Sequence, residues 1–241
     1  MTQSDLTNAP PTPFHLAADQ REEIVPKLRL YDYTASANCL KVRILLAQLD
    51  RPYERVPIDI FDGDTLTDGY FEINPARSTP VLQTEEDEFL PESDAILWYL
   101  ADGTPFLPDT PLERAQVVRW LIFEQADLMP AIGGLRFRLV TGRLSAGDRD
   151  AVRRRKLAAE VLDAMQDRLA STPFFVGGRY SIADIALYAY THVAADADID
   201  LGAYPAVEEW IGRVEATPRF VNDLEPYPPN AAAGAGRSTY D

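Results

Sequence analysis

Three short segments in the first half of the chain combine side chains that could do chemistry. They are YDYTASANCLKV at 31–42, NPARSTPVL at 74–82 and PESDAILWYL at 91–100. The first offers a hydroxyl, an amide and a thiol within one helical turn, at Ser36, Asn38 and Cys39. In a small α/β sheet such turns fall at strand and helix ends, where side chains and helix N-terminal amides can face one ligand. This arrangement favours an anionic ligand.

The elements that must position these segments form a small mixed sheet covered by helices. In LRLYDY at 28–33 the apolar residues alternate loosely, as they do in a strand. After Ser36 the apolar residues recur at helical spacing. A second strand is predicted at 53–59, and strand, helix and strand in this order favour a parallel crossover. A short helix near 70–73 and a hairpin of PVLQ and EFLP follow, and a helix over 92–102 completes the unit.

The second half of the chain is helical throughout. Long helical segments are predicted over 112–140 and 148–169, and a third helix begins at Ser181, where Asp184 stands at capping-box spacing. Pro130 should bend or break the first segment, because proline lacks an amide hydrogen and its ring clashes with the preceding turn.

Glycine and proline residues, which interrupt regular secondary structure, are concentrated between 103 and 111 and place a domain boundary there. The predicted parts are a flexible N-terminal extension at 1–26, an α/β domain at 27–103, an all-helical domain at 111–224 and a flexible tail at 225–241. The two ends are assigned as flexible because neither shows a period that could bury an apolar face.

Composition narrows the class of protein. The chain has 241 residues, 46% of them apolar, which suits a globular protein. It carries 23 Lys and Arg against 38 Asp and Glu, a net charge of −15, which disfavours nucleic acid and anionic membrane as partners.

One cysteine excludes a paired-thiol redox site, and neither histidine has a partner at metal-ligand spacing, so no metal is expected. Without a membrane-spanning run or the basic start of a signal peptide, the expected location is the cytoplasm.

The stretch from Lys27 to Asp223 resembles the cytosolic glutathione S-transferases, and in particular the bacterial type. NPARSTPVL is similar to the family's Asn-Pro-x-Gly-x-x-Pro-x-Leu segment, and PESDAILWYLA is similar to its Glu-Ser-x-Ala-Ile-x-x-Tyr-Leu continuation. A helical half that contains SIADIALYAY follows. Arg77 departs from the pattern, because glycine is common at this position. The resemblance implies a thioredoxin-like α/β domain, an all-helical C-terminal domain and glutathione as co-substrate.

The resemblance also implies which residues hold glutathione. Thr79, Pro80 and Val81 would form the segment that pairs with the cysteinyl part, with a cis peptide bond before the proline. Glu92 and Ser93 would hold the γ-glutamyl end, because a carboxylate suits its ammonium group and a hydroxyl beside helix N-terminal amides suits its carboxylate. From the residues alone, Glu92 and Ser93 are equally explained as helix caps.

The sulfur contact is assigned by the same resemblance, which is to the serine-type branch of the family. Ser36 falls on the hydroxyl that contacts the glutathione sulfur, and a hydrogen bond to a charged group contributes roughly 1.5–3 kcal/mol, or about one to two pKa units. That shift would make the nucleophilic thiolate abundant at neutral pH. The alternatives are Asn38 as the donor, Cys39 as a nucleophile and Tyr31 at the end of the first strand. Ser36 could also be only an N-cap, and Cys39 only a small buried residue.

The expected activity is therefore transfer of glutathione to a small electrophile. A glutathione-dependent disulfide reductase, a dehalogenase and a non-catalytic binding protein remain alternatives, because the glutathione-binding domain would look the same in each. The resemblance further implies a homodimer, in which the first domain of one chain packs against the helical domain of the other.

Overall fold

The first domain is built on a four-stranded sheet. In the computed structural model, which describes residues 28–240, the strands are β1 (Leu28–Asp32), β2 (Tyr53–Pro57), β3 (Val81–Gln83) and β4 (Phe89–Pro91). Their order is β2-β1-β3-β4. β1 pairs in parallel with β2 and antiparallel with β3, and β3 pairs antiparallel with β4. The predicted parallel crossover and hairpin are confirmed, whereas the extension predicted at 1–26 lies outside the described residues.

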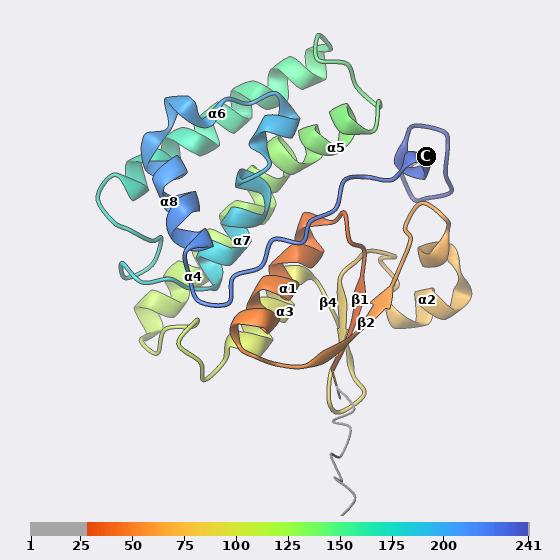
Figure 1. Cartoon of the computed structure of the whole chain (residues 1–241), viewed down its shortest axis with the longest axis horizontal. Helices are drawn as coiled ribbons and strands as arrows, with labels where there is room; N and C mark the ends of the chain where they lie inside the picture. Colours follow the sequence, from red (N-terminus) through yellow and green to blue (C-terminus); the bar gives the residue numbers. More distant parts are fainter. Residues whose placement is uncertain (1–27, 241) are drawn as a thin grey trace, which may run out of the picture.

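Three helices complete the first domain. α1 (Ala37–Gln48) and α3 (Ser93–Ala101) lie on the side of the sheet that meets the second domain, and α2 (Asp68–Ile73), preceded by the 3-10 turn η1 (Asp64–Leu66), lies on the other side (Figure 1). α1 packs against α3 and against α7 of the second domain, so it is covered nearly all round. Its mostly apolar sequence suits that position.

The second domain is entirely helical. It contains α4 (Pro111–Phe123), η2 (Glu124–Gly133), α5 (Gly134–Val140), α6 (Arg149–Leu169), α7 (Ile182–Thr191), η3 (Ala194–Ala197), η4 (Leu201–Ala203) and α8 (Pro205–Glu215). α8 was not predicted from the sequence. Within residues 28–240, no helix is long and apolar enough to cross a membrane.

The segment predicted as one helix over 112–140 is divided in the structure. α4 gives way to η2, a π-helical stretch that contains Pro130, and α5 continues from Gly134. Proline cannot donate the usual helical hydrogen bond, so a local change of helical winding at this point has a direct cause. The predicted distortion at Pro130 is confirmed.

α7 is the central helix of the second domain, and Asp184 fixes its start. The predicted capping box is present, with Ser181 and Asp184 each bonded to the other's backbone amide. The same carboxylate accepts hydrogen bonds from the indole of Trp210 at 3.0 Å and from the amide of Phe175 at 3.2 Å. These bonds satisfy a fully buried carboxylate and join α7 to α8.

The C-terminal tail, residues 225–240, is the segment that was expected to be flexible. It runs from the helical domain past α1 to the region of α2 (Figure 1). The amide of Ala233 donates to the carbonyl of Thr141 at 3.0 Å, and the amide of Arg237 donates to the carbonyl of Phe61 at 2.8 Å. The tail includes η5 (Pro229–Ala231) and buries Ala231. It therefore connects the two domains through specific contacts.

Candidate functional site

A cavity of about 290 Å³ lies where the two domains and the tail meet. The first domain contributes Tyr33, Ser36, Asn38, Ile60, Thr65, Arg77, Ser78 and Thr79. The second contributes Met129, Gly133, Gly134, Phe137, Arg138 and Tyr190, and the tail contributes Tyr227, Thr239 and Tyr240. Such a polar and aromatic cleft between domains is a usual place for a small ligand.

Ser36 and Asn38 bring polar groups to this cavity from the start of α1. Ser36 is the N-cap of the helix, and its hydroxyl oxygen accepts from the amide of Cys39 at 3.4 Å. Accepting that bond leaves the hydroxyl hydrogen of Ser36 able to donate elsewhere. The residue can therefore cap the helix and donate to a ligand at the same time, so the two interpretations of Ser36 are compatible.

The amide of Asn38 is oriented by a chain of hydrogen bonds. Lys41 Nζ lies 3.3 Å from Ser93 Oγ, and Ser93 Oγ lies 3.4 Å from Asn38 Oδ1. An ammonium group only donates, so the Ser93 hydroxyl accepts from Lys41 and gives its own hydrogen to Asn38. The side-chain oxygen of Asn38 is thereby occupied. Its NH₂ group remains a donor on a residue that lines the cavity.

Lys41 itself is fully buried between two carboxylates. It bonds Glu124 of η2 at 2.8 Å and Asp94 of α3 at 3.1 Å. One oxygen of each carboxylate is buried without a hydrogen-bond partner. Burial raises the pKa of Glu124 to about 7, with Lys41 opposing the rise and Asp94 adding to it. The cluster connects both domains directly behind Asn38 and Ser93.

The loop before β3 forms the opposite edge of the cavity. The Thr79–Pro80 bond is cis, as expected from the resemblance, and Thr79 lines the cavity. Asn74 Nδ2 and the Tyr70 hydroxyl hold the carbonyl of Ser78 at 2.9 and 2.8 Å. Arg77, the residue that departs from the family pattern, has a φ of 56°, in the region that favours glycine. Its position explains why glycine is common there.

The remaining residues predicted for glutathione do not line the cavity. Pro80 and Val81 are buried and do not line the cavity. Glu92 is exposed at the N-terminus of α3, and its φ of 72° is a strained backbone conformation of the kind that often marks functional positions. Ser93 is buried, and its hydroxyl is engaged by Lys41 and Asn38.

Two predicted alternates do not reach the cavity. Cys39 is fully buried, and its sulfur accepts from the amide of Tyr33 at 3.4 Å. Burial, with Asp32 adding to the effect, raises the pKa of the Cys39 thiol to about 12. Tyr31 packs edge-on against the rings of Tyr70 and Phe89. Ser36 and Asn38 are the predicted sulfur contacts that the structure brings to the cavity.

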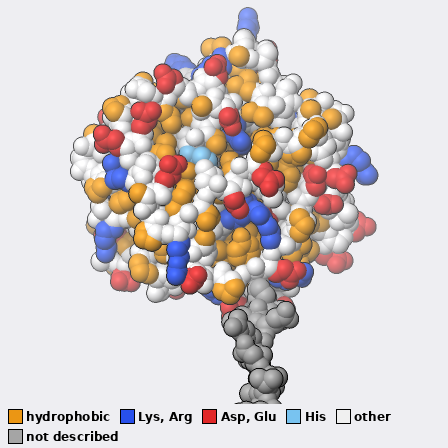
Figure 2. Space-filling view, viewed as in Figure 1, with side chains coloured by type: hydrophobic (Ala, Val, Ile, Leu, Met, Phe, Trp, Pro, Cys, Tyr) orange, Lys and Arg blue, Asp and Glu red, His pale blue; other side chains and the backbone are white. Residues whose placement is uncertain are grey.

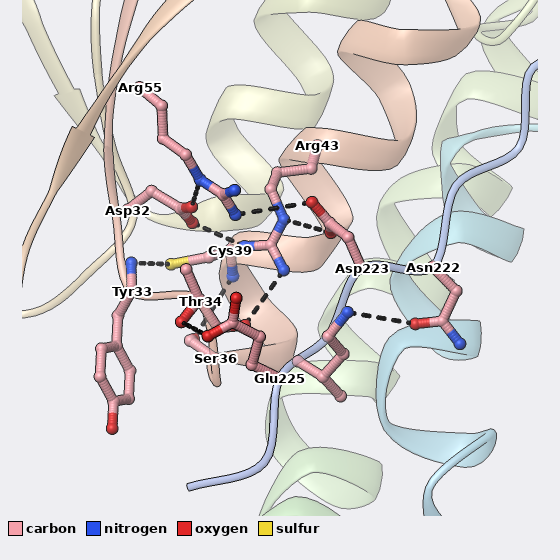
Figure 3. A network of polar contacts seen from close by, with 11 residues as sticks. Asp32, Tyr33, Thr34, Ser36, Cys39, Arg43, Arg55, Asn222, Asp223 and Glu225 are labelled. Atoms are coloured by element: carbon pink, nitrogen blue, oxygen red, sulfur yellow. Dashed lines mark hydrogen bonds and ion pairs between the residues drawn. The ribbon is translucent and has the colours of Figure 1, made fainter. Parts of the chain in front are cut away.

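A second buried charge cluster fixes the turn that carries Ser36. Arg43 bonds Asp32 at 2.7 Å, Asp223 at 2.6 Å and the carbonyl of Thr34 at 3.2 Å (Figure 3). Arg55 also bonds Asp32. Figure 3 shows these groups converging from β1, β2, α1 and the segment that leads into the tail. The turn between β1 and α1 is therefore held from both sides.

The cavity wall formed by the helical domain and the tail was not predicted from the sequence. One signal was present, because Gly133 and Gly134 form a glycine pair inside a helical pattern. A Cβ at Gly133 would lie 2.5 Å from the ring of Tyr190, so glycine allows that ring to pack against the helix beside the cavity. Nothing in the tail's composition indicated that Tyr227 and Tyr240 would reach the same place.

The described residues contain no group of three or more His, Cys, Asp or Glu side chains that could hold a metal ion. The residues that line the cavity supply hydroxyl, amide, phenol and guanidinium groups. Hydroxyl and amide donors at a helix N-terminus can stabilise a bound anion such as a thiolate.

Comparisons with known proteins agree with this architecture. The family model for the glutathione S-transferase N-terminal domain matches residues 35–102, and the model for the glutathione S-transferase C-terminal domain matches residues 149–213. A glutathione S-transferase crystal structure from Pseudomonas fluorescens [Pf-5] superposes with a TM-score of 0.79 at 42% identity, covering 82% of this chain and 99% of that one.

Curated relatives point the same way. Maleylacetoacetate isomerase of Rhizobium meliloti (strain 1021) is 36% identical over 187 residues, which are 73% of this chain and 85% of the relative. Disulfide-bond oxidoreductase YfcG of Escherichia coli (strain K12) is 28% identical over 77% of this chain and 89% of its own length. With both domain models matched in order on a thioredoxin-like sheet followed by a helical domain, the chain belongs to the glutathione S-transferase family.

Proposed function

We propose that the protein binds glutathione in the interdomain cavity, stabilises its thiolate and transfers it to a small electrophile. Ser36 donates its hydroxyl hydrogen to the sulfur, and Asn38 supplies a second donor from the same helical turn. Thr79 pairs with the cysteinyl backbone, and Glu92 and Ser93 lie at the γ-glutamyl end. Cys39 and Tyr31 have no part in this mechanism.

One observation gives the proposal its main support. Ser36 and Asn38 at the start of α1 and Thr79 beside the cis peptide bond all line one cavity. A thiol bound between them meets two uncharged donors and no carboxylate from the cavity wall. Donors of this kind favour the thiolate over the thiol, which makes the sulfur a better nucleophile at neutral pH.

Glutathione-dependent disulfide reduction is the second candidate function. The oriented amide of Asn38 favours it, since in the family branch with this activity an asparagine is the expected sulfur contact. The likeness to the Escherichia coli oxidoreductase adds support. In this reaction the glutathione thiolate attacks one sulfur of a disulfide, forms a new disulfide and releases the other sulfur as a thiolate.

Retention on immobilised glutathione tests the binding step, and two assays of the retained protein separate the reactions. One assay follows conjugation of glutathione to chlorodinitrobenzene, and the other follows reduction of a mixed disulfide between glutathione and hydroxyethanethiol. Conjugation as the faster activity supports the transferase, and reduction alone moves the assignment to the reductase. Retention without either activity would leave a binding protein.

We also propose that the protein is a homodimer. Large apolar side chains are exposed on both domains, including Phe71 and Phe89 on the first and Val118 and Ile122 on the second. A pairing of the first domain of one chain with the helical domain of another would cover them. Sedimentation at micromolar concentration checks this: a stable species of one chain, 26.9 kDa, would remove the proposal.

A further inference from the structure

The charged groups that line the interdomain cavity are all basic. They are Arg77 and Arg138, and none of the lining residues is Asp or Glu. The chain as a whole has a net charge of −15, and acidic side chains are scattered over the face seen in Figure 2. A basic cavity in an acidic protein selects for an anionic ligand, because the positive potential inside the cavity opposes the negative potential of the protein as a whole.

The two arginines stand on different walls of the cavity. Arg77 belongs to the first domain, where it donates to the carbonyls of Thr65 at 2.7 Å and Thr67 at 3.3 Å. It lies two residues before Thr79, on the wall assigned to glutathione. Arg138 belongs to α5 of the helical domain. It therefore faces whatever occupies the rest of the cavity beside the glutathione sulfur.

The positive charge of Arg138 is only partly offset by an acidic group, and that group is Asp150. Its guanidinium donates to the carbonyl of Gly134 at 2.8 Å, and it forms no ion pair within the described part of the chain. Its neighbour Arg154 has the carboxylate of Asp150 at 2.8 Å. Nη1 of Arg138 and Nη1 of Arg154 lie 3.2 and 3.3 Å from the position that a Cβ at Gly134 would take. The two positive charges are therefore close to each other. Burial and then Arg154 lower the pKa of Arg138, and Asp150 opposes this shift.

We infer that Arg138 selects a second substrate that carries a carboxylate, held beside the glutathione sulfur. The inference rests on the proposed function and specifies its co-substrate. A guanidinium presents paired N–H groups that match the two oxygens of a carboxylate, and a bound anion would also relieve the repulsion between Arg138 and Arg154.

The surroundings of Arg138 indicate the rest of that molecule. The ring of Phe137 lies 5.7 Å from that of Tyr227 and 5.1 Å from that of Tyr240, centroid to centroid. All three residues line the cavity. Aromatic walls of this kind pack against a flat apolar body. The chemical class is therefore an electrophile with a planar apolar body and a carboxylate, such as an activated aromatic acid.

The test compares two glutathione conjugates that differ in one group. S-(carboxydinitrophenyl)glutathione carries the carboxylate, and S-(carbamoyldinitrophenyl)glutathione carries a neutral amide of similar size. Their dissociation constants are measured by titration calorimetry on the full chain, which needs no turnover. The wild type should bind the carboxylate conjugate about tenfold more tightly, as expected for one charge-assisted, two-point contact.

Variants assign the preference to Arg138. Arg138→Gln should abolish it while changing the affinity for glutathione itself by less than about twofold. Arg138→Lys, which keeps the charge but loses the paired geometry, should retain part of it. Arg213→Gln, which makes the same change in net charge on α8 outside the cavity, should retain all of it.

Several results would overturn the inference. Equal affinity of the wild type for the two conjugates would do so, as would an unchanged preference in Arg138→Gln or an equal loss for glutathione and both conjugates. In each of these cases glutathione binding survives in the wild type, so the proposed function stands. Failure of the wild type to bind glutathione and both conjugates would overturn the proposed function together with the inference.

Discussion

Arg43 of α1 donates a 2.6 Å hydrogen bond to the carboxylate of Asp223, a residue 180 positions later in the chain. The bond joins the helix that begins at Ser36 to the segment from which the tail departs. Thr34 adds to the same junction, because its hydroxyl donates to Glu225 at 2.8 Å. The turn that carries the candidate sulfur contact and the start of the tail are thus held by one cluster.

The two acidic partners of Arg43 should differ in their effect on stability. Asp223 is half exposed, so Asp223→Asn should lower the free energy of unfolding by about 1 kcal/mol. Asp32 is buried, and Asp32→Asn leaves the buried guanidinium without its main charge partner, which should cost about 3–5 kcal/mol. Urea unfolding followed by circular dichroism measures both. Equal losses would show that Arg43 does not depend on Asp32 for its charge balance.

The tail should be displaced by a single methyl group. A Cβ at Gly236 would lie 2.5 Å from the carbonyl oxygens of Asn230 and Phe61, so Gly236→Ala forces the tail from its position. We expect faster proteolysis of the tail and a raised KM for the electrophile, because Thr239 and Tyr240 leave the cavity wall. Kinetics at saturating glutathione and timed proteolysis measure these effects.

Gly147→Ala is the matched control for that experiment, because no atom lies within 4 Å of a Cβ at Gly147. It should behave as the wild type in both measurements. A Gly236→Ala variant with wild-type proteolysis and an unchanged KM for the electrophile would mean that the tail does not complete the cavity.

Cys39 should be inert in the folded protein. Its thiol has a pKa raised to about 12 from an ordinary value of 9.0, so at pH 8 its thiolate is about a thousandfold scarcer than in the unfolded chain. Labelling with dithiobis(nitrobenzoate) should proceed only after urea is added, and Cys39→Ser should keep its activity. Rapid stoichiometric labelling of the native protein would restore Cys39 as a candidate nucleophile.

The elements around the site could be predicted from sequence because each has a local signature. The strand before Ser36, the helix after it and the capping box of Ser181 and Asp184 are all encoded within a few residues, by hydrophobic period and cap chemistry. The motifs that carry the family resemblance then indicated Thr79, which lines the cavity, and Glu92, which does not. Local patterns of this kind can be recognised without knowledge of the tertiary structure.

The charge clusters and the tail could not be predicted in this way. Lys41 and Arg43 stand in an apolar helix sequence, but their partners Glu124 and Asp223 are 83 and 180 residues away. The tail between 225 and 240 has no period, and it is held by isolated contacts such as that of Asn230 Nδ2 with Asp59 at 2.9 Å. Such contacts depend on where the folded domains place each residue, and a short stretch of sequence does not contain that information.

Stability should depend on pH through Glu124. Burial raises the pKa of this carboxyl from 4.5 to about 7 in the folded state, so the folded protein binds a proton that the unfolded chain releases. Its contribution to stability is present in full below pH 4.5 and is lost as pH rises to about 7. The groups that face it are Lys41, Asp94, Gln125 and Tyr190.

Glu124→Gln isolates this effect, since it removes the titrating group and nearly keeps its shape. The free energy of unfolding of the wild type minus that of Glu124→Gln should decrease as pH rises from 4.5 to 7, measured by urea unfolding at each pH. A difference that stays constant, or increases, over this range would show that Glu124 remains ionised beside Lys41 throughout.

In the proposed mechanism, a hydroxyl at the start of α1 stabilises the glutathione thiolate. The most direct measurement is the pKa of the bound glutathione thiol, followed by its ultraviolet thiolate absorbance, in the wild type, Ser36→Ala and Ser36→Thr. The pKa of the bound thiol should be about one to two units higher in Ser36→Ala than in the wild type, with glutathione affinity nearly unchanged, and Ser36→Thr should keep a near wild-type pKa. A wild-type thiol pKa in Ser36→Ala would contradict this mechanism, and a rise confined to Asn38→Ala would move the sulfur contact to Asn38.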